Sequence, residues 1–215
     1  MSKQQPAHMV EVCTPRFRRM PLVPALEALR DQRRENEVVV TSMGSAREWP
    51  KLSQHALDFH YVPSAMGQAQ SLGLGIALAQ PNRPVIAITG DGSLLMNLGS
   101  LVTIAASGAR NLTVIVLENG IYEVTGGQQT AAASARLAPA YVDFAVMALA
   151  AGIPSARRFH DLPAWQAGVE QALRLPGPRV LVLSVEPVED YDLPMPKPAM
   201  PERVTRIREK LATSK

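Results

Sequence analysis

Two short runs of apolar, mostly β-branched residues constrain the fold of this chain more than any other feature. They cover Val85–Thr89 and Leu112–Leu117, and uninterrupted runs of this length are typical of strands buried on both faces of a parallel sheet. Gly90–Ser93, with the sequence GDGS, follows the first run, and Asn119 follows the second. Because ligands bind where the carboxyl ends of parallel strands meet at one sheet edge, the sequence predicts that Asp91 and Asn119 lie together there.

A carboxylate and a carboxamide at one sheet edge suit a metal ion. Both side chains present oxygen atoms, which are the ligands that Mg²⁺ prefers, and a diphosphate group would complete the coordination shell. Asn119 follows Asp91 by 28 residues. The alternative is two ordinary turns between strands and helices, since Gly and Asp commonly occupy such turns.

The rest of the sequence alternates between helical and strand-like periods. This alternation predicts βαβ crossovers, and therefore an α/β, doubly wound, mostly parallel sheet with helices on both faces. The predicted helices are Leu22–Arg34, Ser64–Gln80, Leu94–Ser107, Tyr141–Ala151, Pro163–Leu173 and Glu202–Ala212, and the further strands are Val38–Val40, Ala156–Phe159 and Arg179–Val185. We divide the chain into an N-terminal arm and helix (1–35), a sheet domain (36–185) and a proline-rich tail with a final helix (186–215).

The composition narrows the class of protein. With 215 residues, 47% of them hydrophobic and 19% charged, the chain is typical of one globular domain. Its single cysteine, Cys13, excludes an internal disulfide framework and an iron–sulfur cluster bound by several cysteines of this chain. The N-terminus lacks the apolar core of a signal peptide, and the longest apolar run, near residues 141–153, is too short to cross a bilayer. We therefore expect a cytoplasmic protein without membrane contact.

The charge distribution gives little support to nucleic-acid binding. The net charge is +3, but the basic residues gather near the two ends of the chain, and the middle has no basic stripe with interleaved aromatic residues. We interpret the basic ends as solvated surface or as a surface that meets another subunit.

A second glycine pattern imitates a dinucleotide-binding fingerprint. It runs from Gly73 to Leu78, with the sequence GLGIAL, and Asp91 follows at the end of the next strand. However, the position of the third small residue is occupied by Leu78, and the glycines lie inside a helical pattern. We interpret Gly73 and Gly75 as packing contacts between a helix and the sheet.

Four short motifs together resemble one enzyme family. They are Ser64–Ala69 (SAMGQA), Gly90–Asn97 (GDGSLLMN), Asn119 and Thr125–Gln128 (TGGQ). The region 36–185 is similar to the thiamine diphosphate (ThDP)-binding domain of 2-oxo acid decarboxylases, in particular to subunit beta of sulfopyruvate decarboxylase and the equivalent half of phosphonopyruvate decarboxylase. The GDG motif is specific for the superfamily, whereas MNLG and TGGQ indicate this branch less specifically.

The resemblance implies a role for each residue at the predicted sheet edge. Mg²⁺ would be bound by the side chains of Asp91 and Asn119 and by the backbone carbonyl of Ile121. The diphosphate would meet backbone N–H groups at the start of a helix, which carries partial positive charge. For Ser42, a helix N-cap is the alternative. The further cofactor-binding residues implied in this way are Ser42, Gly44, Gly90, Gly92, Ser93 and Tyr122.

Three further residues have implied roles near the reacting end of the cofactor. Met66 stands where the family has a bulky apolar residue that holds ThDP in a folded V shape, a task suited to a large, polarizable side chain. An ordinary core methionine is the alternative. The backbone carbonyl of Ser64 would then face the pyrimidine amino group. His60 is a candidate catalytic proton donor or carboxylate anchor, with a structural histidine as the alternative.

The resemblance also implies a missing half of the active site. ThDP enzymes activate the pyrimidine ring with a glutamate from a separate pyrimidine-binding domain, for which 215 residues leave no room. We therefore expect a pyrimidine-binding alpha subunit to supply this glutamate, in an α₂β₂ assembly or larger, of which a homo-oligomer in isolation would be only a part. The surface of Ser64–Ala79 and the loop Gly120–Ala133 would meet the partner.

The implied reaction is decarboxylation of a small 2-oxo acid, with the cofactor as electron sink. An acetolactate synthase-like carboligase and a non-catalytic ThDP-binding or regulatory subunit are alternatives, whereas the single cysteine disfavours a pyruvate:ferredoxin-type oxidoreductase. Arg47 or Arg136 could pair with an anionic substrate head. Arg47 could equally form an exposed ion pair with Glu48, and Glu123 is either a second acid near the metal or a surface residue.

Overall fold

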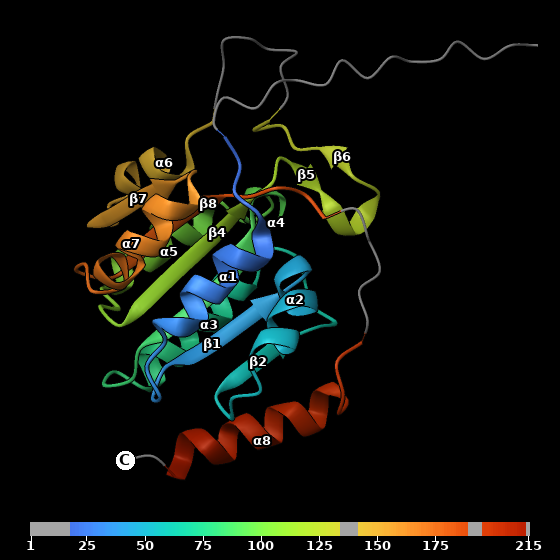
Figure 1. Ribbon diagram of the computed structural model, residues 1–215. Helices are drawn as coiled ribbons and strands as arrows, with labels where there is room; N and C mark the ends of the chain where they lie inside the picture. Colours follow the sequence, from blue (N-terminus) through green and yellow to red (C-terminus); the bar gives the residue numbers. More distant parts are fainter. Residues whose placement is uncertain (1–17, 134–141, 189–194, 214–215) are drawn as a thin grey trace, which may run out of the picture.

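A computed structural model describes residues 18–133, 142–188 and 195–213. Its centre is a six-stranded sheet in which every neighbouring pair of strands is parallel (Figure 1). The predicted doubly wound α/β fold is confirmed. In spatial order the strands are β2 (Asp58–Tyr61), β1 (Val38–Ser42), β3 (Val85–Gly90), β4 (Leu112–Glu118), β8 (Arg179–Ser184) and β7 (Ser155–Phe159).

Separate layers of helices cover the two faces of the sheet. Successive side chains of a strand point to opposite faces of the sheet. In β1, Val39 accordingly belongs to one hydrophobic core, whereas Val38 and Val40 belong to the other. Among the described helices, none is both long and apolar enough to span a bilayer. The first layer holds α1 (Leu22–Asp31), α2 (Gly44–Leu52) and α7 (Leu162–Leu173), and the second holds α3 (Ala69–Ala79), α5 (Gly99–Ser107), α6 (Phe144–Ala150) and α8 (Met200–Thr213).

Both flanking helices pack against the sheet. Helix α1 buries Leu26 and Leu29 completely in the first core, and α8 inserts Ile207 into the second. In Figure 1 the red helix α8 runs alongside β2, at the outer edge of the sheet. The predicted final helix is thus confirmed, although it begins earlier, at Met200.

The order of the strands opens a crevice at their carboxyl ends. From β1 the chain passes outward to β2 and then returns to the other side of β1 to form β3. Helix α2 follows β1 and places Trp49 in the first core, whereas α4 (Asp91–Leu95) follows β3 and places Leu94 in the second. The two connections therefore leave toward opposite faces, which creates a gap between them.

Several elements differ from the sequence prediction for local reasons. Strand β2 was not predicted, because this edge strand is only partly buried and correspondingly mixed in composition. The predicted helix Ser64–Gln80 begins only at Ala69, after Gly67 adopts a left-handed φ of 81°. The predicted helix Leu94–Ser107 is divided into α4 and α5 by a turn. The predicted helix from Tyr141 is observed as α6, and Tyr141 itself lies outside the described residues.

A small hairpin follows β4 and lies beside α4. Its strands are β5 (Ile121–Tyr122) and β6 (Gln128–Gln129), which pair antiparallel and are joined through the 3₁₀ helix η1 (Glu123–Thr125). The Thr130 N–H closes the base of the hairpin by donating to the Gly120 carbonyl at 2.9 Å. The segment predicted as an irregular loop is therefore an ordered wall of the crevice.

Candidate functional site

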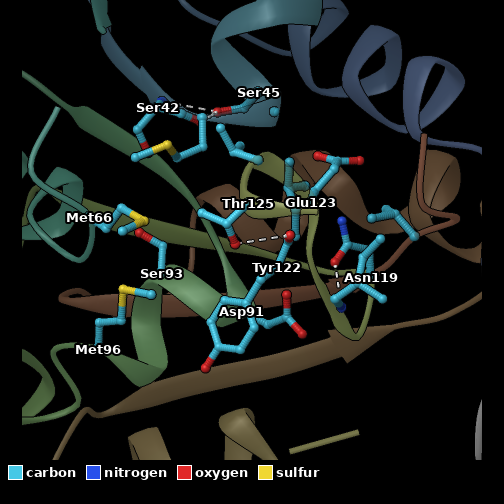
Figure 2. A pocket seen from close by; sticks show the side chains of 18 of the residues that line it. Ser42, Ser45, Met66, Asp91, Ser93, Met96, Asn119, Tyr122, Glu123 and Thr125 are labelled. Atoms are coloured by element: carbon cyan, nitrogen blue, oxygen red, sulfur yellow. Dashed lines mark hydrogen bonds between the residues drawn. The ribbon is translucent and has the colours of Figure 1, made fainter. Parts of the chain in front are cut away.

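A cavity occupies the crevice and gathers most of the predicted site residues (Figure 2). All of the predicted residues line it except His60 and Ser64. The other lining residues, which the sequence analysis did not assign to the cofactor, come mainly from the turn after β1 and from the hairpin. The complete lining is Leu22, Ser42, Met43, Gly44, Ser45, Met66, Gly90, Asp91, Gly92, Ser93, Met96, Leu117, Asn119, Ile121, Tyr122, Glu123, Val124, Thr125 and Val185.

Asp91 is a buried carboxyl group at the floor of this cavity. Only 1% of the residue is exposed, and one carboxyl oxygen, Oδ2, accepts a hydrogen bond from the Gly120 N–H at 3.0 Å. Burial raises the pKa of Asp91 to about 7, and the charge of Glu118 adds to this effect, whereas hydrogen bonds from the Gly92 and Gly120 N–H groups oppose it. The ionised form of Asp91 is therefore unfavourable in the folded chain, and a cation bound beside the carboxylate would stabilise it.

Asn119 lies next to this carboxyl group, as the strand order predicts. Strands β3 and β4 pair directly, with Gly90 opposite Leu117, so the residues that follow their ends are neighbours. The Asn119 Oδ1 accepts the Ile121 N–H at 3.0 Å, which fixes the turn carrying the Ile121 carbonyl (Figure 2). The described residues contain no cluster of three His, Cys, Asp or Glu side chains. One carboxylate with neutral oxygens nearby is a donor set that fits Mg²⁺ better than a transition metal.

The turn between β1 and α2 forms another wall of the cavity. Met43 has φ of 52° and ψ of −131°, a conformation that is strained for a residue with a side chain. The Ser45 hydroxyl holds the turn, because it accepts the Ser42 N–H at 3.1 Å and donates to the Ser42 carbonyl at 2.7 Å. Helix α2 begins at Gly44, so its N-terminal N–H groups lie at the cavity. Backbone N–H groups at a helix start attract anions such as phosphate.

Glu123 and Arg47 form a buried pair behind this turn. Arg47 is 5% exposed and Glu123 is 9% exposed, and their charged groups are 3.7 Å apart. Arg47 also pairs with Glu48 at 2.8 Å, and Glu123 accepts the Val188 N–H at 3.0 Å. The predicted exposed Arg47–Glu48 pair is therefore wrong, because both residues are buried, and Glu123 is not a surface residue. The guanidinium of Arg47 is already committed to carboxylates, and Arg136 lies outside the described residues.

The turn that carries Met66 is held by two side chains from the GDGSLLMN motif. The Ser93 hydroxyl accepts the Gly67 N–H at 2.8 Å, and the Asn97 amide donates to the Gly67 carbonyl at 2.8 Å. Met66 is 43% exposed and lines the cavity, so it is not a core methionine. In Figure 2, Met66 and Met96 lie across the cavity from Asn119. Asn97 belongs to the motif that was identified in the sequence, but its role in holding the turn was not predicted.

The two histidines near this turn make structural contacts. His60 lies on β2 outside the cavity lining, and its Nδ1 is 2.9 Å from the Thr41 hydroxyl. Burial lowers the pKa of the His60 imidazole, with Asp58 opposing and Arg203 adding to this effect. His55 contacts Arg33 and the Leu57 N–H. His60, the predicted catalytic candidate, therefore lies outside the cavity lining, and its ring contacts Thr41 of the neighbouring strand β1.

Comparisons with known proteins identify the kind of domain to which this cavity belongs. The family model described as the C-terminal TPP binding domain of thiamine pyrophosphate enzymes matches residues 40–183. The chain belongs to this family. The resemblance inferred from the sequence is therefore confirmed, and the cavity of this ThDP-binding domain lies at the sheet edge where the GDG motif and Asn119 meet.

Individual relatives agree with this assignment. Phosphonopyruvate decarboxylase of Streptomyces viridochromogenes is 36% identical over 187 residues, which cover 86% of this chain and 45% of the relative. Sulfopyruvate decarboxylase subunit beta of Methanothermobacter thermautotrophicus is 38% identical over 154 residues, which cover 71% of this chain and 76% of the relative. The ThDP-binding domain thus spans about half the length of the phosphonopyruvate decarboxylases that it matches.

A solved structure shares the fold. It is an enzyme of Mycobacterium smegmatis with a provisional assignment as thiamin diphosphate-dependent. The TM-score is 0.65 at 24% identity, and the match covers 81% of this chain and 33% of that chain.

Gly90 offers a direct test of whether the cavity receives the cofactor. A Cβ atom at Gly90 would meet nothing within 4 Å, and its φ of −85° suits any residue. We therefore expect Gly90→Ala to leave the melting temperature of the metal-free chain within about 2 °C of wild type. Because the added methyl group would enter the cavity, the affinity for ThDP with Mg²⁺ should fall roughly tenfold or more, as measured by calorimetry.

Gly92→Ala provides the contrast. Its Cβ would come within 2.6 Å of the Tyr122 ring, so this variant should lose thermal stability as well as affinity. Wild-type affinity in Gly90→Ala would place the cofactor elsewhere.

Proposed function

We propose that this chain is the diphosphate-binding subunit of a two-subunit enzyme that uses ThDP and Mg²⁺ to decarboxylate a small 2-oxo acid. The observation that supports this best is the placement of Asp91 and Asn119 in one cavity with the N-terminus of α2. The names of its relatives, phosphonopyruvate decarboxylase and sulfopyruvate decarboxylase subunit beta, indicate the class of reaction.

The proposal gives each part of the cavity a task. Asp91, Asn119 and the Ile121 carbonyl would hold Mg²⁺, which would offset the charge of the buried carboxylate. ThDP supplies the electron sink that makes decarboxylation feasible. Met66 would press against the bound cofactor and set its bent shape, because its side chain is exposed into the cavity. The phosphate contacts would come from Ser42, Gly44, Gly90, Gly92 and Ser93, with Tyr122 nearby.

Among the residues that the structure describes, the cavity lining does not offer a second acid that could activate the pyrimidine ring. Two carboxylates are present among its described lining residues, Asp91 and Glu123. Asp91 is assigned to the metal, and Glu123 is occupied by Arg47 and the Val188 N–H. We therefore infer that the activating glutamate comes from a complementary pyrimidine-binding subunit.

The outer surface of α3 and α5 is the face that we assign to this partner. A groove between the two helices combines apolar lining residues such as Leu74 and Leu78 with polar ones such as Asn97. Leu78 is 55% exposed, and Val102 of α5 is 59% exposed. Exposed apolar surface of this kind on a subunit indicates an interface that is not yet covered. An α₂β₂ assembly, or a larger one, would bury it.

The purified chain should show negligible decarboxylase activity when it is alone. The test is CO₂ release from pyruvate, 3-phosphonopyruvate and 3-sulfopyruvate with ThDP and Mg²⁺, first without and then with the complementary subunit. Activity is expected only in the second case, because only then is the pyrimidine-activating acid present. Robust turnover by the chain alone would overturn the two-subunit proposal.

The same assay separates the alternatives. A carbon–carbon bonded product, such as 2-acetolactate and CO₂ from two molecules of pyruvate, in place of a free aldehyde would indicate an acetolactate synthase-like carboligase. ThDP binding without turnover of any of the three acids in the complete assembly would indicate a regulatory subunit. The open cavity and the intact set of Asp91, Asn119 and Met66 favour a subunit that takes part in the reaction.

A further inference from the structure

Arg203 connects the C-terminal helix to the edge of the sheet. It lies on α8, only 7% exposed, and its guanidinium donates to three backbone carbonyls. Nε donates to Pro198 at 2.8 Å, Nη1 donates to His60, and Nη2 donates to Val62. The buried guanidinium thus joins the backbone just before α8 to the backbone at the end of β2.

The strand geometry explains why an arginine fits this position. Strand β2 is an edge strand, so one of its sides has no neighbour among the strands of the described residues. At the end of β2 the Val62 N–H turns back to the His60 carbonyl at 3.0 Å, and the carbonyls of His60 and Val62 are the two that Arg203 reaches. A guanidinium donates to two such acceptors from separate nitrogens of one rigid plane, whereas a lysine would have to reach both from a single, freely rotating ammonium. Ile207, one turn further along α8, anchors the helix in the core.

The segment beyond Val62 leads directly to the turn that carries Met66. At its far end this turn is fixed by Ser93 and Asn97 through Gly67. At its near end the Ala65 N–H donates to the Tyr61 hydroxyl at 3.5 Å, and Arg203 binds the carbonyls of His60 and Val62. The turn is therefore held between the GDG motif on one side and the C-terminal helix on the other.

We propose that Arg203 is a positioning residue for Met66, and that α8 thereby sets the shape of the cofactor site from outside the cavity. This inference rests on the proposed function for its catalytic consequence. Without the guanidinium, the Val62 carbonyl loses the Arg203 donor and the His60 carbonyl keeps only the Val62 N–H, so Val62–Gly67 loses its tie to the C-terminal helix. The metal and diphosphate residues lie after β3, after β4 and in the turn after β1, and the hydrogen bonds of Arg203 go instead to Pro198, His60 and Val62, so these residues should keep their arrangement.

Hydrogen exchange of the metal-free chain tests the structural half of this proposal. The N–H groups of Val62, Gly67 and Gln68 are all hydrogen-bonded, to His60, Ser93 and Ala65 respectively. In Arg203→Met, which keeps the length of the side chain, these three amides should exchange about tenfold faster or more, while amides in β3 and β4 keep wild-type rates. Arg203→Lys should give an intermediate rate. Arg208→Met, on the exposed side of the same helix, is the matched control and should change nothing.

Kinetics in the complete assembly test the functional half. Arg203→Met should lower kcat by roughly 10-fold to 100-fold, as expected for a misplaced group near the reaction, with the affinity for ThDP and Mg²⁺ within about threefold of wild type. The double variant with Met66→Ala should be no slower than Met66→Ala alone, since both changes act on one element. An independent, multiplicative loss would overturn the proposal.

The exchange result stands even if the enzyme proves to have another activity. Unchanged exchange in residues 62–68 would reject the role of Arg203. Faster exchange throughout the sheet, or failure of both Arg203→Met and Arg203→Lys to fold, would show that Arg203 serves general stability and does not position Met66.

Discussion

Asp91→Asn is expected to abolish measurable binding of ThDP with Mg²⁺ and, at the same time, to make the metal-free chain more stable. Binding is lost because the carboxylate is the only charged protein ligand in the proposed metal set, and the diphosphate charge would be left uncompensated. Stability rises because a buried charge is replaced by a neutral amide of the same shape, whose oxygen can still accept the Gly120 N–H.

The stability gain should depend on pH in a defined direction. The pKa of Asp91 is about 7 in the folded chain, against an ordinary value of 3.8. Between these values the folded chain keeps a proton that the unfolded chain has released, so the free energy of unfolding falls as pH rises from about 4 to 7. Each pKa unit is worth about 1.4 kcal/mol, so the free energy of unfolding above pH 7 should be lower than that below pH 4 by on the order of 4 kcal/mol.

Thermal unfolding of the metal-free proteins at pH 4.5 and pH 8 would measure this effect. At pH 8 the melting temperature of Asp91→Asn should exceed that of wild type by about 5 °C or more, and at pH 4.5 the difference should shrink. Asp161→Asn is the matched control, because Asp161 caps α7 away from the cavity and Asn caps equally well. A destabilised Asp91→Asn that still binds the cofactor would contradict the metal role of Asp91.

Met66→Ala should have the opposite profile, with binding preserved and turnover lost. The side chain is exposed in the cavity, so its removal costs little folding stability. Metal and diphosphate contacts remain, and the affinity for ThDP should stay within roughly tenfold. Because a misplacement of about 1 Å at a reacting centre can cost ~10²-fold in rate, kcat should fall by about that factor in the complete assembly.

Met96 supplies the control for this experiment. It is 48% exposed and lines the same side of the cavity, but it lies on the link between α4 and α5. Met96→Ala should therefore retain most of the turnover. A larger loss in Met96→Ala than in Met66→Ala would exchange the roles that we assign to the two methionines.

The sheet was predictable because its central strands are buried on both faces. Residues 85–89 and 112–117 have no polar face to obscure the pattern, and both runs proved to be strands. Strand β2 escaped prediction because Asp58 and His60 are polar and partly exposed at the sheet edge. The break between α4 and α5 also escaped, since it depends on Asn97 reaching across to Gly67, a contact far apart in the sequence.

The residues that line the cavity could be predicted where they follow the ends of buried strands, but the burial of charged residues behind the cavity could not. Asp91 and Asn119 could be placed together because each follows a buried apolar run. The environment of Arg47 could not be inferred, because a short helix with alternating charges reads as solvated surface, whereas the fold covers it with Glu123 from the hairpin. His60 was attractive by proximity in sequence to Met66, but the strand direction places it against Thr41.

The divergence of α2 and α4 toward opposite faces has a mechanical consequence. The crevice lies between two helical layers that pack in separate cores on opposite faces of the sheet. A ligand that binds the start of α2 on one side and the β3–α4 turn on the other would link these two layers directly. Sliding of one layer against the other would then strain the bound ligand, so binding should dampen slow breathing motions of the whole subunit and raise its resistance to unfolding.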